Sequence, residues 1–348
     1  MTEQVDGGAL WASGDPDTIV VGDNLEVLRR LPDESFRLIY VDPPFNTGRK
    51  QSRQSLRTKR AGADEVGDRV GFGGHSYVTL RGAALAYDDA FAQYWDFLGP
   101  RLAEAYRLLT PDGTLYVHLD YREVHYAKVL LDGLFGREGF LNEIIWAYDY
   151  GARTTKRWPA KHDNILVYVK DPARYWFDSD EVDREPYMAP GLVTKEKRER
   201  GKLPTDVWWH TIVSPMGKEK TGYPTQKPLG ILRRIVAASS KPGDTVLDFF
   251  GGSGTTGAAA RELGRKFLLI DQNPEAIEVM RKRFAAMSDA DVGAGDDAAA
   301  GDGAGSGEVR IVDASGHAVD AGLTDAGRYG AGFLWRLRDD GGLSLIHI

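Results

Sequence analysis

The chain has 348 residues, with 44 Lys and Arg against 51 Asp and Glu, a formal net charge of −7, and no cysteine. This length is enough for one large α/β domain or two modest ones. The lack of cysteine excludes disulfides, thiolate metal sites and a cysteine nucleophile, and it fits a reducing cytoplasm. The negative balance means that any contact with nucleic acid must come from local basic patches.

The beginning of the sequence has neither a basic start nor an apolar run. No stretch of the sequence approaches the roughly 20 apolar residues of a membrane span. We therefore expect a cytoplasmic protein without a membrane partner.

After a tail over residues 1–17, the sequence predicts a βαβ unit. An apolar run from Thr18 is followed by leucines at helical spacing and by a second apolar run that ends at Val41. Residues 49–87 are rich in glycine, serine and arginine with little periodicity, which indicates a mobile or ligand-ordered segment. The later periodicity predicts helices over 91–109 and 123–134 and strands over 114–119, 142–148 and 164–169. Residues 18–170 thus form one half of an α/β domain.

The second half of the chain resumes this alternation after an irregular stretch. Residues 171–220 carry a charged run and scattered aromatics, and we expect an inserted region there. Residues 221–287 indicate helices and strands around a glycine-rich turn, which is a second βαβ unit. Residues 288–308 consist almost entirely of glycine, alanine and aspartate, which predicts a flexible acidic linker. The main fold is therefore predicted to end near Ser288.

Two short segments follow this linker. Residues 309–342 could pair as a small β-rich module. The last six residues, LSLIHI at 343–348, resemble the translation of a common sequencing-library adapter. We interpret them as an artefact, leave them out of fold reasoning and expect the natural chain to be longer, with the module truncated.

The segment VLDFFGGSGTTG, residues 246–257, has the order that a nucleotide-type site needs. Its glycine turn lets backbone N–H groups approach a ligand, and the helix that follows favours a negative group at its N-terminus. Gly252, Gly254 and Gly257 satisfy the spacing G-x-G-x-x-G, and Asp271 ends the next strand, where a carboxylate can accept hydrogen bonds from ribose hydroxyls. Alone, the pattern fits NAD, another adenosine-containing cofactor, or a turn needed only for packing.

The tetrad Asp42-Pro43-Pro44-Phe45 ends a strand of the other βαβ unit. The exocyclic amino group of a base is a poor nucleophile, because its lone pair is delocalised into the ring. Hydrogen bonds to the Asp42 carboxylate and the Pro43 carbonyl would draw the nitrogen toward a tetrahedral, more nucleophilic form. The prolines would stiffen the loop, and Phe45 could stack on a base flipped from the duplex. By itself, the tetrad could also be an ordinary strand-end turn.

Together, four segments resemble the DNA methyltransferases that modify adenine N6 or cytosine N4 with S-adenosylmethionine, in the subclass whose catalytic motif precedes the cofactor motif. They are, in order, VGDNLEVLRRLPDESFRLIYVDPPFNTG, FLGPRLAEAYRLLTPDGTLYVHLDYREVHYAKVLLDGLFG, HDNILVYVKD and YPTQKPLGILRRIVAASSKPGDTVLDFFGGSGTTGAAARELGRKFLLIDQNPE. The form DPPFNTG is most similar to modification subunits of type III restriction–modification systems.

This resemblance covers residues 18–285. It implies a Rossmann-like α/β fold with circularly permuted motif order, in which a mostly parallel sheet carries helices on both faces. It also implies that the inserted region over 171–220 serves target recognition.

The resemblance further implies a role for each motif residue. Asp42, Pro43, Pro44 and Phe45 would hold the target base. S-adenosylmethionine would be bound by residues from both halves of the chain: Asp23, Thr225, Gln226, Lys227, Asp248, Phe250, Gly252, Gly254, Thr255 and Asp271.

Among these cofactor residues, Asp23 would lie near the adenine, Asp271 at the ribose hydroxyls, Asp248 near the methionine moiety and the TQKP run, Thr225 to Pro228, near its carboxylate. Two positions depart from the commoner pattern. Phe45 replaces a tyrosine and lacks its hydroxyl, and Asp271 replaces a glutamate and has a shorter arm.

The implied reaction is a direct in-line transfer, in which the amino nitrogen attacks the sulfonium methyl and the proton leaves afterwards. It needs no metal, and we interpret the seven histidines as ordinary surface or core residues. Methylation at cytosine C5 needs a covalent thiolate and is excluded by the lack of cysteine.

The Asp-Pro-Pro form is closer to the adenine enzymes than is the Ser-Pro-Pro form typical of the cytosine enzymes. We therefore expect adenine N6 as the target, with cytosine N4 as the alternative. Two further hypotheses are a DNA-recognition subunit that no longer methylates and serves a partner nuclease, and a nicotinamide-dependent oxidoreductase.

Residues 49–60 follow the catalytic loop and hold six basic residues and no acid: Arg49, Lys50, Arg53, Arg57, Lys59 and Arg60. We interpret them as contacts to the phosphates of double-stranded DNA, the alternative being a solvated loop. A second loop combines cations with an aromatic and fits DNA contact or a plain surface equally well; it carries Arg153, Lys156, Arg157, Trp158 and Lys161. A restriction nuclease subunit and a second copy of the chain are candidate protein partners.

Overall fold

The computed structural model of the chain describes residues 10–46, 49–60, 69–70, 76–89, 94–151, 153–214, 217–293, 309–319, 333–337 and 343–347. Within these ranges, no helix combines the length and the apolar character needed to cross a bilayer. The last part of the predicted tail belongs to the core. Leu10 and Trp11 are buried, and the Trp11 ring stacks on Phe36 at a centroid distance of 4.7 Å.

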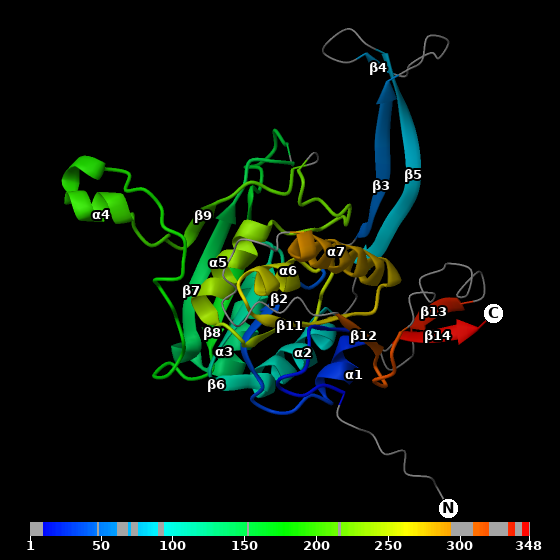
Figure 1. Cartoon of the computed structure of the whole chain (residues 1–348), viewed down its shortest axis with the longest axis horizontal. Coiled ribbons are helices and arrows are strands. Elements are labelled where there is room, and N and C mark those ends of the chain that lie inside the picture. Colours follow the sequence, from blue (N-terminus) through cyan, green and yellow to red (C-terminus); the bar gives the residue numbers. More distant parts are fainter. Residues whose placement is uncertain are drawn as a thin grey trace, which may run out of the picture.

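A nine-stranded sheet in the order β12-β1-β11-β10-β2-β6-β8-β7-β9 forms the centre of the molecule (Figure 1). Its strands are β1 (Thr18–Val21), β2 (Phe36–Val41), β6 (Leu109–Leu119), β7 (Phe140–Ala147), β8 (His162–Val169), β9 (Val207–Trp209), β10 (Thr245–Asp248), β11 (Lys266–Asp271) and β12 (Arg310–Asp313). Only β8 is antiparallel to its neighbours in this sheet. The predicted mostly parallel α/β fold is confirmed.

Helices cover both faces of the sheet, because side chains along each strand alternate between two apolar clusters. In β2, Ile39 joins the cluster under the first group of helices, α1 (Asn24–Leu28), α2 (Tyr94–Leu108) and α3 (Val124–Phe135). Leu38 joins the cluster under the second group, α5 (Leu229–Ser239), α6 (Thr255–Glu262) and α7 (Pro274–Gly293). Figure 1 shows α5, α6 and α7 together on one side of the sheet.

The two motif-bearing strands are neighbours although they are far apart in the sequence. β10 pairs with β2 in parallel, with Val246 opposite Leu38 and Leu247 opposite Ile39. The glycine turn after β10 and the DPPF tetrad after β2 therefore emerge at the same edge of the sheet. Ligands of open α/β sheets bind at the carboxyl ends of the strands, so the fold places the predicted site where such sheets bind ligands.

Residues 49–89 differ from the sequence-based prediction. The backbone forms a long antiparallel hairpin of β3 (Arg49–Arg60) and β5 (Ser76–Asp89), with β4 (Arg69–Val70) alongside, and it projects from the body in Figure 1. The sequence did not predict this hairpin, because main-chain pairing needs no hydrophobic alternation. That the segment is mobile or ordered by a ligand stays a prediction. The side chains of the six basic residues in β3 lie outside the described residues, and their contact with DNA stays a prediction.

The region between β8 and α5 is mostly irregular, as expected for residues 171–220. It contains a short 3-10 helix (Pro190–Leu192), the helix α4 (Lys195–Arg200) and β9. β9 pairs in parallel with β7 and so extends the main sheet. Another 3-10 helix (Arg137–Gly139) leads into β7.

The C-terminal part also differs from the prediction that the fold ends near Ser288. α7 continues to Gly293, and β12 is the edge strand beside β1, with Arg310 opposite Thr18. The sequence predicted β structure after residue 308 but as a separate module, because a long stretch of glycine, alanine and aspartate precedes it; residues 294–308 of that stretch lie outside the described part. β13 (Phe333–Leu337) and β14 (Leu343–His347) pair with each other, and the adapter origin of residues 343–348 stays a prediction.

Candidate active site

The DPPF tetrad is held at the end of β2 by two other elements. The hydroxyl of Tyr94 in α2 donates to the Pro44 carbonyl at 2.7 Å. The amide of Asn46 donates to Glu123, in the turn before α3, at 2.9 Å. These contacts, together with the fixed φ of the two prolines, hold Asp42 and Phe45 in a defined position.

Lys227 lies directly on the predicted catalytic carboxylate. Its ammonium donates to both oxygens of Asp42, at 2.6 and 2.5 Å, and lies 4.8 Å from the centre of the Phe45 ring. The sequence led us to expect Lys227 at the carboxylate of the cofactor, whereas the structure gives it Asp42 as a partner. The Lys227 ammonium therefore contacts both the Asp42 carboxylate and the Phe45 ring, the two groups that the sequence assigns to the target base.

The glycine turn after β10 requires glycine at two positions. Gly252 has φ +48° and Gly254 has φ +70°, a region that other residues rarely adopt. A Cβ at Gly254 would lie 2.9 Å from Met280, and one at Gly252 would lie 3.3 Å from the ring of Tyr223. The backbone of the turn therefore packs against Met280 and Tyr223 more closely than a residue with a Cβ at these two positions would permit.

Two carboxylates support this turn. Asp271 accepts a hydrogen bond from the Gly252 N–H at 2.8 Å. Asp248 is buried and accepts from the Phe250 N–H at 2.9 Å and from the Thr256 hydroxyl at 2.6 Å. Burial raises the pKa of Asp248 to about 7 against these two hydrogen bonds, and the charges of Asp42 and Asp271 act in the same direction as burial. Burial also raises the pKa of Asp271.

The first βαβ unit reaches the same turn. The Asn24 amide donates to the Phe249 carbonyl at 2.6 Å, and the Phe250 ring packs against Phe97 of α2. The Asp23 carboxylate caps α1 and pairs with Arg101 at 2.9 Å. Asp23 and Phe250, which the sequence predicts to bind the cofactor, therefore both lie near the junction of α1, α2 and the glycine turn.

The side chains of two other predicted cofactor residues, Gln226 and Thr255, form hydrogen bonds with neighbouring residues of the protein. Gln226 accepts from Thr221 and donates to the Glu219 carbonyl, which braces the loop before α5. Thr255 is buried; its hydroxyl accepts from Arg283 and shares a hydrogen bond with the hydroxyl of Ser253. Thr225 is exposed on the loop that Gln226 braces.

Sequence reasoning missed a chain of four polar side chains, three of them buried, one of which packs against Phe45. Tyr40 lies 2.8 Å from His118 Nδ1, His118 Nε2 lies 3.2 Å from Asp163, and the Tyr148 hydroxyl donates to Asp163 at 3.0 Å. The His118 ring lies 5.9 Å from that of Phe45. His118 thus bridges Tyr40 and Asp163 through its two ring nitrogens.

This chain also fixes the charge state of Asp163. Burial opposes ionisation, but the hydrogen bond and charge of His118, with Lys227 nearby, hold the pKa of Asp163 below its usual value. The four residues come from β2, β6, β8 and the end of β7 and have no common spacing, so no sequence motif marks them. A single histidine within an apolar strand was the one available signal.

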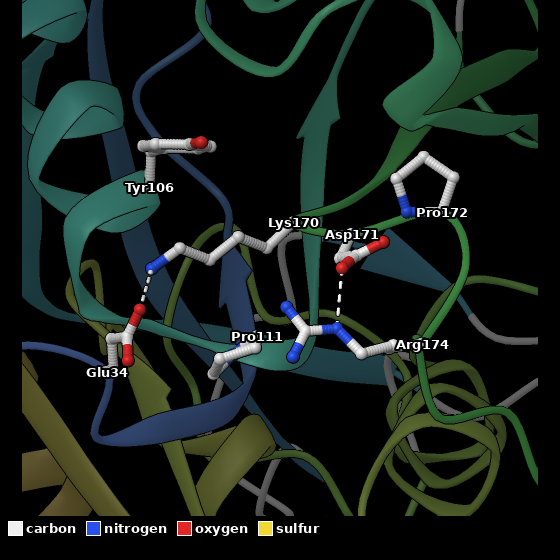
Figure 2. Close-up of a pocket in the computed structure, with 7 residues that line it drawn as sticks. All are labelled: Glu34, Tyr106, Pro111, Lys170, Asp171, Pro172 and Arg174. Atoms are coloured by element: carbon white, nitrogen blue, oxygen red, sulfur yellow. Dashed lines mark hydrogen bonds and ion pairs between the residues drawn. The ribbon is translucent and has the colours of Figure 1, made fainter.

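A separate hollow lies at the opposite edge of the sheet. Figure 2 shows its lining of Glu34, Tyr106, Pro111, Lys170, Asp171, Pro172 and Arg174, around a volume of about 290 Å³. Lys170 pairs with Glu34 at 3.1 Å and Arg174 with Asp171 at 2.6 Å. Glu34 precedes β2, whereas Asp42 follows it, so this hollow is distinct from the site at the carboxyl ends of the strands.

The chain is similar to known DNA methyltransferases in sequence. A family model described as DNA methylase, N6/N4 type, matches residues 36–282. The DNA adenine methyltransferase YhdJ of Escherichia coli (strain K12) is 32% identical over 276 residues, which cover 77% of this chain and 82% of that protein. The type II methyltransferase M.HpaI of Haemophilus parainfluenzae is 30% identical over 268 residues, 76% of this chain and 73% of that protein.

Solved structures share the fold. The PvuII DNA methyltransferase, described as cytosine-N4-specific, matches with a TM-score of 0.52 at 18% identity, over 78% of this chain and 90% of that one. TTHA0409 from Thermus thermophilus, in a structure complexed with S-adenosyl-L-methionine, matches with a TM-score of 0.50 at 22% identity, over 85% and 98%.

The family match spans well over half of the chain, from β2 to α7. It includes the DPPF tetrad, Lys227 and the glycine turn, which the sheet brings to one edge. The chain therefore belongs to the N6/N4 DNA methylase family.

Proposed function

We propose that this protein transfers a methyl group from S-adenosyl-L-methionine to the N6 amino group of adenine in double-stranded DNA. The observation that carries the proposal is the contact of the Lys227 ammonium with both oxygens of Asp42, beside Phe45. An ammonium and an exocyclic amino group both present N–H donors. A flipped base that displaces Lys227 can therefore make the same contact with the carboxylate.

The chain's own residues then act on the target nitrogen. Asp42 accepts a hydrogen bond from the amino group, and the carbonyl of Pro43 accepts the second. Both bonds favour the tetrahedral form of the nitrogen, whose lone pair is free to react. Phe45 stacks on the base, and its position is fixed by the buried His118 and by the Tyr94 bond to Pro44.

The residues at the end of β10 fit S-adenosyl-L-methionine. The turn at Gly252 and Gly254 offers close backbone approach, and the carboxylates of Asp248 and Asp271 lie beside it. We assign the cofactor to this turn, with Asp271 at the ribose hydroxyls and Phe250 and Asp23 on the adenine side. When bound, the cofactor supplies an electrophilic methyl group for in-line attack. Before the base enters, the Lys227 ammonium is engaged by Asp42, so we do not assign it to the cofactor in that state.

Adenine is favoured over cytosine by two observations. The Asp-Pro-Pro form resembles the adenine enzymes more than the Ser-Pro-Pro form typical of the cytosine enzymes does, and the relative at 32% identity is described as an adenine methyltransferase. The similarity to the cytosine-N4-specific PvuII enzyme concerns the fold alone, at 18% identity. Cytosine N4 is the alternative target, since its amino group has the same chemistry.

The system to which the enzyme belongs is a separate question. Two of the relatives are described as type II methyltransferases. The likeness of DPPFNTG to type III modification subunits, the partner nuclease and the homodimer stay predictions from the sequence. A subunit that only recognises DNA is disfavoured, because Asp42 and the glycine turn are both intact and follow adjacent strands.

The proposal is tested with the purified full-length chain. The protein is incubated with S-adenosyl-L-methionine carrying a labelled methyl group and with unmethylated phage DNA, and the DNA is digested to nucleosides for mass spectrometry. We expect label in N6-methyladenine. Asp42→Ala is expected to bind the cofactor normally and to transfer no label. Transfer by Asp42→Ala, or label in N4-methylcytosine, would overturn the catalytic assignment or the choice of base, respectively.

A further inference from the structure

The loop between β7 and β8 exposes aromatic side chains to solvent. This β7–β8 loop comprises residues 148–151 and 153–161 of the described chain. Trp158 is 94% exposed and Tyr150 is 59% exposed. Tryptophan is highly buried on average in folded proteins, because its large apolar surface is costly to leave in water. An almost fully exposed tryptophan therefore indicates a surface that a partner covers.

The same loop is rich in basic residues. The β7–β8 loop carries Arg153, Lys156, Arg157 and Lys161 but only one acid, Asp149. Asp149 lies 3.7 Å from the Lys161 ammonium, so the positive charge around Trp158 is not balanced within the loop. Positive charge beside an exposed aromatic ring is the combination with which proteins bind phosphates and stack on unpaired bases. This charge balance favours nucleic acid over an apolar protein surface.

The strand directions place the β7–β8 loop at the edge of the sheet that carries Asp42. β6 is parallel to β2, β8 is antiparallel to β6, and β7 is antiparallel to β8. The carboxyl end of β7 therefore lies at the same edge as the carboxyl end of β2. The loop begins where β7 ends, so Trp158 and the catalytic tetrad belong to one side of the molecule.

Side-chain contacts connect the loop to the catalytic tetrad. The Arg157 guanidinium lies 5.9 Å from the centre of the Tyr121 ring, and its Nη2 lies 3.4 Å from the Tyr121 hydroxyl. Tyr121 belongs to the turn after β6, and Glu123 in that turn accepts from Asn46, the residue after the tetrad. One turn of chain thus separates the β7–β8 loop from the site of the target base.

We propose that the β7–β8 loop binds the DNA beside the target base and that Trp158 stacks on the bases exposed when the target leaves the helix. The inference rests on the proposed function, because it takes duplex DNA as the substrate. A flipped base leaves a gap lined by unstacked base faces, and the flat apolar ring of Trp158 fills it while the loop cations hold the neighbouring phosphates.

The test compares wild type with three variants of the full chain. Trp158→Ala removes the ring, Trp158→Phe keeps a smaller one, and Val129→Ala serves as the control for loss of an exposed apolar side chain. Val129 is 73% exposed and lies in α3, outside the β7–β8 loop and the inserted region. The probes are a random-sequence DNA duplex and the same duplex with one central abasic site, which mimics the gap left by a flipped base.

We expect wild type to bind the abasic duplex more tightly than the intact one. Trp158→Ala should lose this preference and bind the abasic duplex roughly tenfold more weakly, as expected for the loss of one aromatic–base stack. Trp158→Phe should retain part of it, and Val129→Ala should behave as wild type. The affinity of every variant for S-adenosyl-L-methionine, measured by titration calorimetry, should be unchanged, which separates this effect from misfolding.

The outcomes distinguish this inference from the proposed function. If wild type methylates DNA and Trp158→Ala binds both duplexes as wild type does, the role of Trp158 is overturned and the proposed function stands. If binding depends on Trp158 but wild type transfers no methyl group, the proposed function fails and the DNA contact stands. If Trp158→Ala changes self-association in sedimentation and leaves DNA affinity intact, the ring covers a second copy of the chain, and the inference is wrong.

Discussion

The ammonium of Lys227 lies 2.5 Å from one oxygen of the Asp42 carboxylate and 2.6 Å from the other. The two residues are 185 positions apart in the chain, and the pairing brings the turn before α5 onto the end of β2. Their side chains are only 11% and 17% exposed, so both charges are largely withdrawn from water. Lys227 therefore contacts the carboxylate that, in the proposed function, accepts a hydrogen bond from the target amino group.

Removal of either Lys227 or Asp42 should destabilise the protein, because it leaves the charge of the other residue unpaired and largely withdrawn from water. Lys227→Met leaves the Asp42 carboxylate without its cation, and Asp42→Asn leaves the ammonium without its anion. We expect each to lower the free energy of unfolding by about 1–3 kcal/mol. The double variant should be destabilised by less than the sum, because it leaves no unpaired charge. Urea unfolding of all four proteins measures this coupling, and strictly additive effects would contradict the pairing.

The partner of Lys227 also predicts an effect on cofactor binding. Because its ammonium is engaged by Asp42, Lys227→Met should leave the affinity for S-adenosyl-L-methionine unchanged. Titration calorimetry with the purified variant measures this affinity directly. A marked loss would instead support the role that the family resemblance implies, a contact between Lys227 and the methionine carboxylate.

Substitution of alanine for a glycine of the turn should lower the stability of the protein, whereas the same substitution within a helix should raise it. Gly254→Ala forces a Cβ to within 2.9 Å of Met280 at φ +70° and should destabilise the protein by about 1–2 kcal/mol or more. Gly252→Ala should weaken cofactor binding, because its Cβ enters the space between the turn and Tyr223.

Gly133 in α3 is the matched control. A Cβ at Gly133 would meet no atom within 4 Å. Gly133→Ala should therefore stabilise the protein by about 0.5–1 kcal/mol, since alanine favours a helix interior. Thermal unfolding compares the variants. Equal effects at Gly133 and Gly254 would show that the turn does not need its left-handed backbone.

The pKa of Asp248 predicts a pH dependence of stability. Burial raises this pKa from 3.8 to about 7, so between these values the folded protein holds a proton that the unfolded chain has released. The contribution of Asp248 to stability therefore falls as the pH rises through this window and is constant above it. Asp248→Asn mimics the protonated carboxyl and does not titrate.

The comparison of wild type with Asp248→Asn isolates this group, because all other titrations are shared. The free energy of unfolding of wild type should fall relative to that of Asp248→Asn as the pH increases from 3.8 to about 7. Denaturant unfolding at a series of pH values supplies the difference. A difference that stays constant over this window would show that Asp248 ionises normally in the folded protein.

Local sequence patterns predict the framework of this protein well. Apolar runs and helical spacing locate β1, β2, β10 and β11, since each pattern reflects burial in a sheet with helices on both faces. Gly252 and Gly254 and the DPPF tetrad are recognisable because the chemistry constrains neighbouring residues. The adjacency of β10 and β2 follows from the family resemblance rather than from the patterns themselves.

Long-range pairings could not be read from the sequence. The Lys227–Asp42 contact and the chain from Tyr40 through His118 to Asp163 join residues on separate elements, with no spacing that marks them. The β3–β5 hairpin escaped prediction because its pairing is made by the main chain. The pairing of β12 with β1 was missed, because most of the chain separates the two strands and the segment after residue 308 was interpreted as a separate β-rich module.

The central claim is that Asp42 directs methylation of adenine in DNA. The full chain and Asp42→Ala are expressed separately in a host that lacks its own DNA methylation, and modified bases are mapped across the genome by single-molecule sequencing. We predict N6-methyladenine at one recurring motif with the wild-type chain and none with Asp42→Ala. Methylation that persists in Asp42→Ala, or the lack of any modified base with the wild-type chain, would contradict this claim.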